Sequence, residues 1–221
     1  MNPPLRTALA LLAIVSAGVL GYSFYRWLHQ PPAPAPLAAA PQPKDNAPEQ
    51  PAQASIPDKR PVFSLQDRDG KPRSITEWDG KSLVINFWAT WCAPCRREIP
   101  FLRKLHAARA SQNIEIIGIA VDFRENVLDY VKEVEIDYPL LIGEQDGLDA
   151  AAAFGLGAMG FPFTVFTDNQ GRIVTAYLGE LHQAQADLIL DTVVALNQGS
   201  LTLEQGKARI ASGLKELGPP G

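Results

Sequence analysis

The chain has 221 residues, of which 46% are hydrophobic, and it carries a formal net charge of −4 at pH 7. This charge excludes a strongly basic nucleic-acid binder. The length and composition are sufficient for one folded domain with a sizeable core, with further segments beside it.

An uncharged apolar segment runs from Thr7 to Tyr25 near the N-terminus. A helix of about 19 residues at ~1.5 Å each is ~28 Å long, close to the hydrocarbon thickness of a bilayer. Aromatic residues gather at its far end, as they do at membrane–water interfaces: Tyr22, Phe24, Tyr25 and Trp27. We therefore predict N-terminal cytoplasmic residues over 1–6 and a single transmembrane helix, a signal anchor, over 7–28.

A cleaved signal peptide is the alternative interpretation of this segment. Cleavage requires small residues directly after the apolar core, whereas most of positions 22–28 are occupied by bulky residues. The positive-inside rule gives little orientation, because Arg6 is balanced by Arg26. We expect an anchor in the bacterial inner membrane with the later residues in the periplasm, where closely spaced cysteines encounter oxidised thiols.

Residues 29–60 are predicted to form a flexible linker. Ten of the nineteen prolines of the chain lie between Pro31 and Pro61, among alanines and glutamines. A segment of this composition cannot build a core. Proline-rich chains extend by up to ~3.1 Å per residue, so the linker can hold the folded part tens of ångströms from the membrane.

One α/β domain is predicted over residues 61–198, followed by a C-terminal helical extension over 199–221. A hairpin signal spans 62–75, and an uninterrupted apolar run predicts a buried strand over 82–88. Helical periodicity follows over 95–110. The remaining segments indicate strand, helix, strand, helix, hairpin and helix, over 114–121, 127–134, 138–142, 148–154, 163–178 and 184–196. This order predicts a mixed central sheet with helices on both faces.

The two cysteines of the chain, Cys92 and Cys95, lie directly after the strand over 82–88. Their spacing allows a small disulfide if the first caps a helix and the second lies one turn inside, so the pair can store two electrons reversibly. A zinc site needs about four ligands, and no ligand-spaced cluster with the pair is formed by His29, His106 and His182. We predict a redox-active disulfide with no metal and no other cofactor.

Cys92 is the expected nucleophile, because a sulfur at a helix N-terminus faces unpaired amide donors that stabilise its thiolate. Cys95 is the expected resolving cysteine. A partner disulfide would form a mixed disulfide with Cys92, which Cys95 would then release.

The segment over 86–100, NFWATWCAPCRREIP, resembles the active-site segment of membrane-anchored TlpA/ResA-like thiol-disulfide oxidoreductases, which have a thioredoxin-like fold. The similarity covers about residues 61–198. It implies that Pro162 is a cis-proline opposite the cysteine pair. It also implies that Glu98 matches an acidic residue that accepts protons for the pair. Asn86 stands where thioredoxins carry a buried aspartate, and asparagine cannot titrate.

By this resemblance, an extended substrate lies beside the cis-proline against an apolar lip formed by Trp91, Ala93, Pro94, Phe161 and Pro162. The implied function is a periplasmic protein-disulfide reductase that receives electrons from a membrane thiol donor. Its expected clients are apocytochromes c or copper-site assembly proteins, and nothing in the sequence demands an oligomer, so we expect a monomer.

Two other functions use the same fold. A copper-delivery chaperone spaces its cysteines more widely and adds a histidine ligand. A thiol peroxidase carries threonine and proline upstream of its cysteine, where this chain has Ala89 and Ile85. The direction of electron flow is not fixed by Ala93 and Pro94, because related pairs span ~150 mV.

Overall fold

The computed structural model of the chain describes residues 24–25, 28–29, 56–157 and 159–218. The predicted cytoplasmic residues 1–6 lie outside these ranges, as do most of the anchor over 7–28 and most of the linker over 29–60. Among the described residues, no helix combines the length and the apolar character needed to cross a membrane. The folded domain lies in the unit that follows Glu49.

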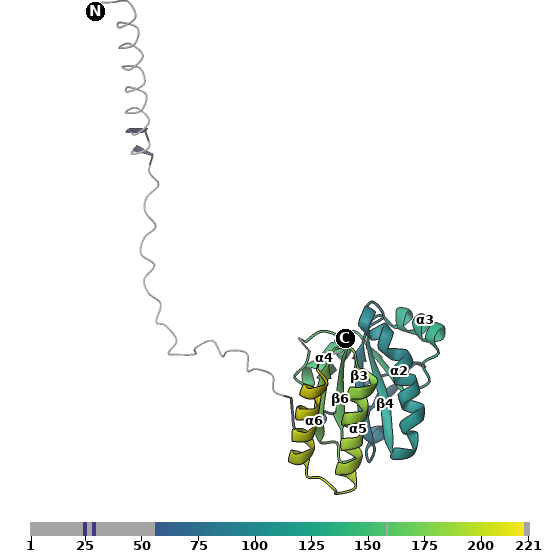
Figure 1. Ribbon diagram of the computed structural model, residues 1–221. Coiled ribbons are helices and arrows are strands. Elements are labelled where there is room, and N and C mark those ends of the chain that lie inside the picture. Colours follow the sequence, from purple (N-terminus) through teal and green to yellow (C-terminus); the bar gives the residue numbers. More distant parts are fainter. Residues whose placement is uncertain (1–23, 26–27, 30–55, 158, 219–221) are drawn as a thin grey trace, which may run out of the picture. The chain divides into compact units, whose positions relative to one another are not determined.

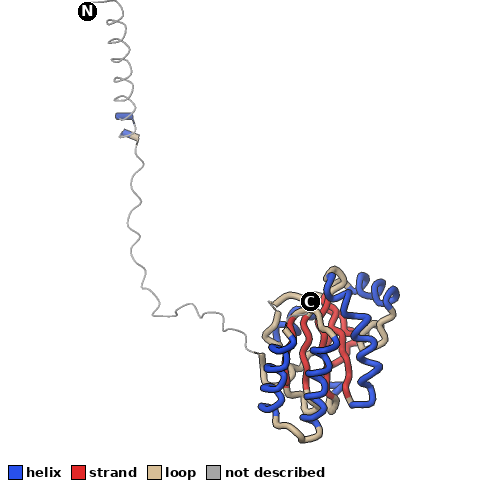
Figure 2. Tube along the Cα trace, in the orientation of Figure 1, coloured by secondary structure: helices blue, strands red, loops and turns tan. Residues whose placement is uncertain are grey.

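A seven-stranded mixed sheet forms the centre of the domain, in the order β2-β1-β5-β4-β3-β6-β7 (Figures 1 and 2). Its parallel centre consists of β3 (Ser82–Trp88), β4 (Ile114–Val121) and β5 (Leu140–Gly143). Antiparallel pairs extend both sides: β1 (Ser64–Gln66) with β2 (Pro72–Ser74), and β6 (Phe163–Thr167) with β7 (Ile173–Leu178). Every residue of β3 is buried, as expected for a strand covered on both faces.

Helices cover both faces of this sheet (Figure 1). One face packs against α2 (Ala93–Arg109), α3 (Arg124–Val134), α5 (Gln183–Asn197) and α6 (Leu203–Leu217). The other face packs against α4 (Gln145–Ala153) and the 3-10 turn Ile75–Trp78. Because successive side chains of a strand alternate, β3 contributes Val84 and Trp88 to the first core and Ile85 and Phe87 to the second.

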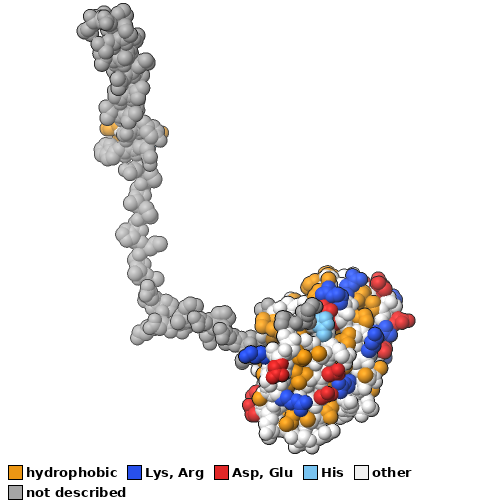
Figure 3. Space-filling view, in the orientation of Figure 1, with side chains coloured by type: hydrophobic (Ala, Val, Ile, Leu, Met, Phe, Trp, Pro, Cys, Tyr) orange, Lys and Arg blue, Asp and Glu red, His pale blue; other side chains and the backbone are white. Residues whose placement is uncertain are grey.

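The surface over α5 and α6 mixes apolar side chains with both signs of charge (Figure 3). Arg109 at the end of α2 binds two carboxylates of α5, with its Nη2 2.5 Å from Asp187 Oδ1 and its Nη1 2.7 Å from Asp191 Oδ1. These contacts join α2, which carries the cysteines, to the neighbouring helix.

The structure confirms a thioredoxin-like α/β fold with the predicted order of elements. The largest boundary differences are at α3 and α4, which begin three residues before the predicted 127 and 148. Both helices begin with polar residues, and a polar first turn adds nothing to the apolar periodicity from which their starts were predicted.

The folded unit includes residues on both sides of the predicted 61–198 domain. Ile173 N donates to Asp58 O at 2.8 Å, and Lys59 forms an isolated β-bridge with Arg172, so residues 58–60 pair with the start of β7. At the other end, Ile210 of α6 is 1% exposed and belongs to the same core as α2 and α5. The C-terminal helix is therefore packed against the domain.

Candidate active site

Both cysteines lie at the N-terminus of α2, directly beyond the end of β3. Cys92 is the N-cap residue, and its Sγ accepts a hydrogen bond of 3.3 Å from the backbone N of Cys95 in the first turn. Ala93 and Pro94 begin the helix, where proline is tolerated because the first amides have no intrahelical partner. The two sulfurs form a disulfide, with the Cα atoms 5.3 Å apart. This is the cap-and-first-turn arrangement that the spacing predicted.

The two sulfurs differ in their access to solvent. Cys92 is 5% exposed, whereas Cys95 is completely buried. Of the two sulfurs, Cys92 is therefore the one that is more accessible to an external thiol or disulfide. This asymmetry supports the predicted division into a nucleophile and a resolving cysteine.

Glu98 lies one turn after Cys95 on α2 and is buried, with 1% of its surface exposed. Its Oε1 accepts a hydrogen bond of 2.7 Å from Asn86 Nδ2, and its Oε2 accepts one of 2.8 Å from Leu181 N. Burial raises the pKa of Glu98 from 4.5 to about 7, against the two hydrogen bonds, which favour the ionised form. A carboxyl with this pKa can take up and release protons near neutral pH.

Asn86 connects the buried carboxyl to the sheet. It belongs to β3, is fully buried, and its Nδ2 also donates to Thr164 Oγ1 of β6 at 3.0 Å. Because an amide cannot titrate, Asn86 fixes the position of Glu98 without competing with it for a proton. Glu98 is therefore a buried carboxyl and not a solvated surface residue.

The peptide bond between Phe161 and Pro162 is cis, as the resemblance implied. Pro162 directly precedes β6, whose Phe163 pairs with Phe87 of β3. The loop that contains Phe161 and Pro162, here called the proline loop, therefore lies at the end of β3 that leads to Cys92. The rings of Trp91 and Phe161 have centroids 6.1 Å apart, and Trp91 is 70% exposed.

These rings form part of the predicted apolar lip. Ala93 is exposed beside them, Pro94 is half-buried and Pro162 is buried. The binding of substrate by the five residues of the lip stays a prediction.

The loop after β7 joins the proline loop to α2, which the sequence did not indicate. Gly179 N donates to Pro162 O at 2.9 Å, and Leu181 N donates to Glu98. Between them, Glu180 Oε2 accepts from Arg97 Nε at 2.8 Å. These contacts use backbone groups and a surface ion pair, which leave no motif in the sequence.

In the part of the chain that the structure describes, no three or more His, Cys, Asp or Glu side chains are grouped so that they could hold a metal ion.

The sequence profile of the Redoxin family matches residues 55–193. The chain belongs to the redoxin family. This redoxin is similar to the thiol-disulfide oxidoreductase ResA of Halalkalibacterium halodurans, at 28% identity over 186 residues that cover 84% of this chain and 92% of that protein. Its identity to the ResA of Geobacillus thermodenitrificans is 29% over 134 residues, which cover 60% and 75% of the two chains.

A solved structure supports the same relationship. A thiol:disulfide interchange protein of the thioredoxin family from Chlorobium tepidum TLS is 33% identical, with a TM-score of 0.56, and the match covers 62% of this redoxin and 97% of that chain. Family membership and the Cys92–Cys95 disulfide together make the protein a thiol-disulfide oxidoreductase.

Proposed function

We propose that this redoxin is a membrane-anchored reductase that reduces disulfides in partner proteins in the bacterial periplasm. The observation that carries the proposal is the arrangement at the start of α2. Cys92 keeps 5% of its surface exposed, whereas Cys95 and Glu98 are 0% and 1% exposed in the first turns of the helix. This arrangement suits a nucleophile that forms a mixed disulfide and a protected partner that resolves it.

The exchange begins from the reduced pair. The Cys92 thiolate attacks one sulfur of the partner disulfide, so that a new sulfur–sulfur bond forms and the other partner sulfur leaves as a thiolate. The Cys95 thiol then loses its proton and attacks Cys92 Sγ, which releases the second partner sulfur. The partner ends with two thiols after protonation, and the enzyme ends with the Cys92–Cys95 disulfide, which is the state in the structure.

Glu98 supports the second step as the acceptor of the Cys95 proton. It lies one turn from Cys95 on the same helix, and its pKa of about 7 places its proton uptake in the neutral range. Reduction of the disulfide by a donor reverses the transfer, because the carboxyl can return the proton to Cys95.

The proposed membrane anchoring and periplasmic location of the enzyme are based on the N-terminal sequence. The apolar segment over 7–28 would anchor the chain in the inner membrane, and the proline-rich linker over 29–60 would let the domain reach clients in the periplasm. Electrons would come from a membrane thiol donor, the clients would include apocytochromes c or copper-site assembly proteins, and the protein would act as a monomer. The reduced Cys92/Cys95 pair itself carries the two electrons, so no cofactor is required.

Substrate trapping tests this proposal. The Cys95→Ala variant can form a mixed disulfide through Cys92 but cannot resolve it, so we expect it to accumulate covalent adducts with periplasmic proteins that disappear on treatment with dithiothreitol. The matched control is the double variant Cys92→Ala/Cys95→Ala, which should form none. If Cys95→Ala yields no adducts beyond those of the double variant, the proposed reductase activity is wrong.

Membrane anchoring is tested separately by fractionation. We expect the full chain to stay in the membrane pellet after a carbonate wash and a chain that begins at residue 29 to be released. Release of the full chain by the wash would contradict the anchor.

A further inference from the structure

Asp122 lies beside the active-site turn although it contacts neither cysteine. It directly follows β4, the parallel neighbour of β3, and the register of the two strands pairs Trp88 with Ala120. If this register is continued two residues beyond the end of each strand, Asp122 lies opposite Thr90, which belongs to the segment between β3 and Cys92.

The carboxylate of Asp122 accepts hydrogen bonds from two donors of Thr90. Its Oδ2 accepts a hydrogen bond of 3.1 Å from Thr90 N and a second bond from the Thr90 hydroxyl. Its Oδ1 accepts from Phe123 N at 2.7 Å and from Asn126 Nδ2 at 3.3 Å. Asp122 is only 7% exposed, so these hydrogen bonds are largely shielded from water. Hydrogen bonds to a charged acceptor are stronger than those between neutral groups.

Thr90 occupies a corner of the turn that sets the position of Cys92. Cys92 N donates to Ala89 O at 3.2 Å, which closes a four-residue turn with Thr90 and Trp91 at its two central positions. The hold on Thr90 therefore fixes the backbone between β3 and α2. The same turn directs Trp91 outward, 70% exposed, and places Cys92 at the helix cap.

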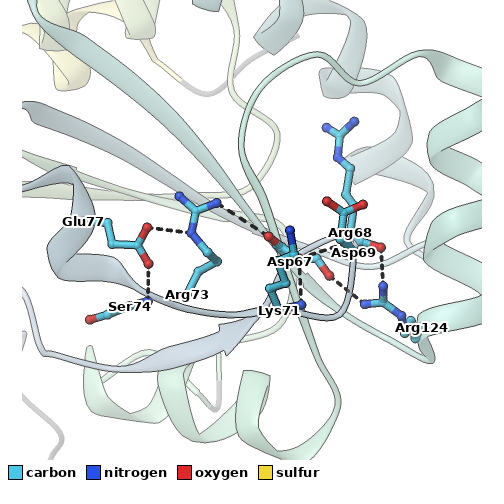
Figure 4. A network of polar contacts seen from close by, with 8 residues as sticks. All are labelled: Asp67, Arg68, Asp69, Lys71, Arg73, Ser74, Glu77 and Arg124. Carbon is cyan, nitrogen blue, oxygen red and sulfur yellow. Dashed lines mark hydrogen bonds and ion pairs between the residues drawn. The ribbon is translucent and has the colours of Figure 1, made fainter.

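The segment that carries Asp122 is itself anchored on its other side. Arg124 Nη1 donates to Asp67 O at 2.7 Å and its Nη2 donates to Arg68 O, both in the turn between β1 and β2 (Figure 4). Asp67 in turn accepts from Lys71 N at 2.9 Å through its Oδ1, which closes that turn. The backbone segment that carries Asp122 is thus held in place by the turn between β1 and β2.

We propose that Asp122 is a positioning residue of the exchange reaction, which acts through Thr90 to hold Cys92 and Trp91 in the geometry for attack on a partner disulfide. In-line attack by one sulfur on another demands precise placement, and a displacement of about 1 Å can cost on the order of a hundredfold in rate. The inference rests on the thiol–disulfide chemistry of Cys92 and is independent of the client protein and of the physiological direction.

The test uses the reduced full-length protein in detergent and a synthetic peptide with an internal disulfide as the probe, with the first attack followed in single turnover. Thr90→Val removes the hydroxyl and keeps the shape of the side chain, whereas Thr90→Ser keeps the hydroxyl. We expect Thr90→Val to slow the attack by about tenfold and Thr90→Ser to stay within about twofold of the wild type. All rates are expressed per folded molecule, determined from near-UV circular dichroism.

Asp122→Asn provides a second arm that does not depend on the folding of Thr90→Val. It keeps an acceptor for Thr90 N but loses the charge, so we expect a severalfold slower attack, with Asp129→Asn on the exposed face of α3 as a control at the wild-type rate. Because the two positions act as one contact, the double variant should be no slower than the slower single variant.

Three results would overturn the proposal: Thr90→Val within about twofold of the wild type, Thr90→Ser as slow as Thr90→Val, or Asp122→Asn equal to Asp129→Asn. Failure of the wild type to reduce the probe would instead contradict the proposed reductase function. A merely structural role would lower the melting temperature but leave the rate per folded molecule unchanged, which is the first of these three results.

Discussion

Glu98 and Asn86 form a buried hydrogen bond of 2.7 Å that joins α2 to the central strand β3. The bond connects a titratable group to one that cannot titrate, one helical turn from Cys95. Leu181 N holds the other carboxylate oxygen, so the carboxyl is fixed from the sheet and from the loop after β7.

The raised pKa of Glu98 makes the stability of the domain depend on pH. Burial raises this pKa in the folded protein from 4.5 to about 7, so the ionised form is disfavoured by folding. The contribution of Glu98 to stability is fully present below about pH 4.5 and is lost as pH rises towards and through 7. The shift corresponds to about 3 kcal/mol in the free energy of unfolding.

Comparison with Glu98→Gln isolates this effect, because glutamine does not titrate. We expect the unfolding free energy of the oxidised variant, measured in urea relative to the oxidised wild type, to rise by about 3 kcal/mol between pH 4.5 and 8. A difference between the two proteins that does not change with pH would show that Glu98 has an ordinary pKa.

Trp91 should contribute to the binding of protein substrates and little to the chemistry. Its ring is 70% exposed next to Phe161, so it offers apolar area only when a partner covers it. We expect Trp91→Ala to raise the KM for a protein disulfide by about tenfold, corresponding to ~1.4 kcal/mol, with a small change in kcat. Val62→Ala, at another exposed apolar side chain, serves as the control. An unchanged KM would remove Trp91 from the substrate surface.

The C-terminal helix should be needed for the stability of the domain. Ile210 of α6 is 1% exposed in the core shared with α2 and α5, so Ile210→Ala leaves a cavity. We expect it to lower the free energy of unfolding by about 3 kcal/mol, whereas Arg209→Ala on the exposed side of the same helix should change it by less than about 0.5 kcal/mol. Equal stability of the two variants would mean that α6 does not support the domain.

Much of the site could be predicted from local sequence. The cysteine spacing after an apolar strand predicted the cap position of Cys92 and the first-turn position of Cys95, because a helix start is specified by neighbouring residues. The order of elements followed from apolar periodicity in the same way. Pro162 needed the family resemblance, since the sequence around a single X-Pro bond does not specify its isomer.

The remaining parts depend on contacts between distant segments. One of the hydrogen bonds to the Glu98 carboxylate comes from the backbone amide of Leu181, which lies 83 residues away in the sequence. The hydrogen bonds between Asp122 and Thr90 depend on the register between β3 and β4, and no local sequence pattern specifies that register. No motif in the sequence therefore marks either Asp122 or the loop over 179–182 as part of the site.

The reduction potential of the Cys92/Cys95 pair tests the central claim most directly. It can be measured by equilibrating the protein with dithiothreitol or glutathione buffers and quantifying the free thiols. A reductase of protein disulfides should have a potential near the about −270 mV of thioredoxin, so that electrons flow to its clients. A potential near about −120 mV, characteristic of a disulfide donor, would contradict the account and assign this redoxin to oxidation.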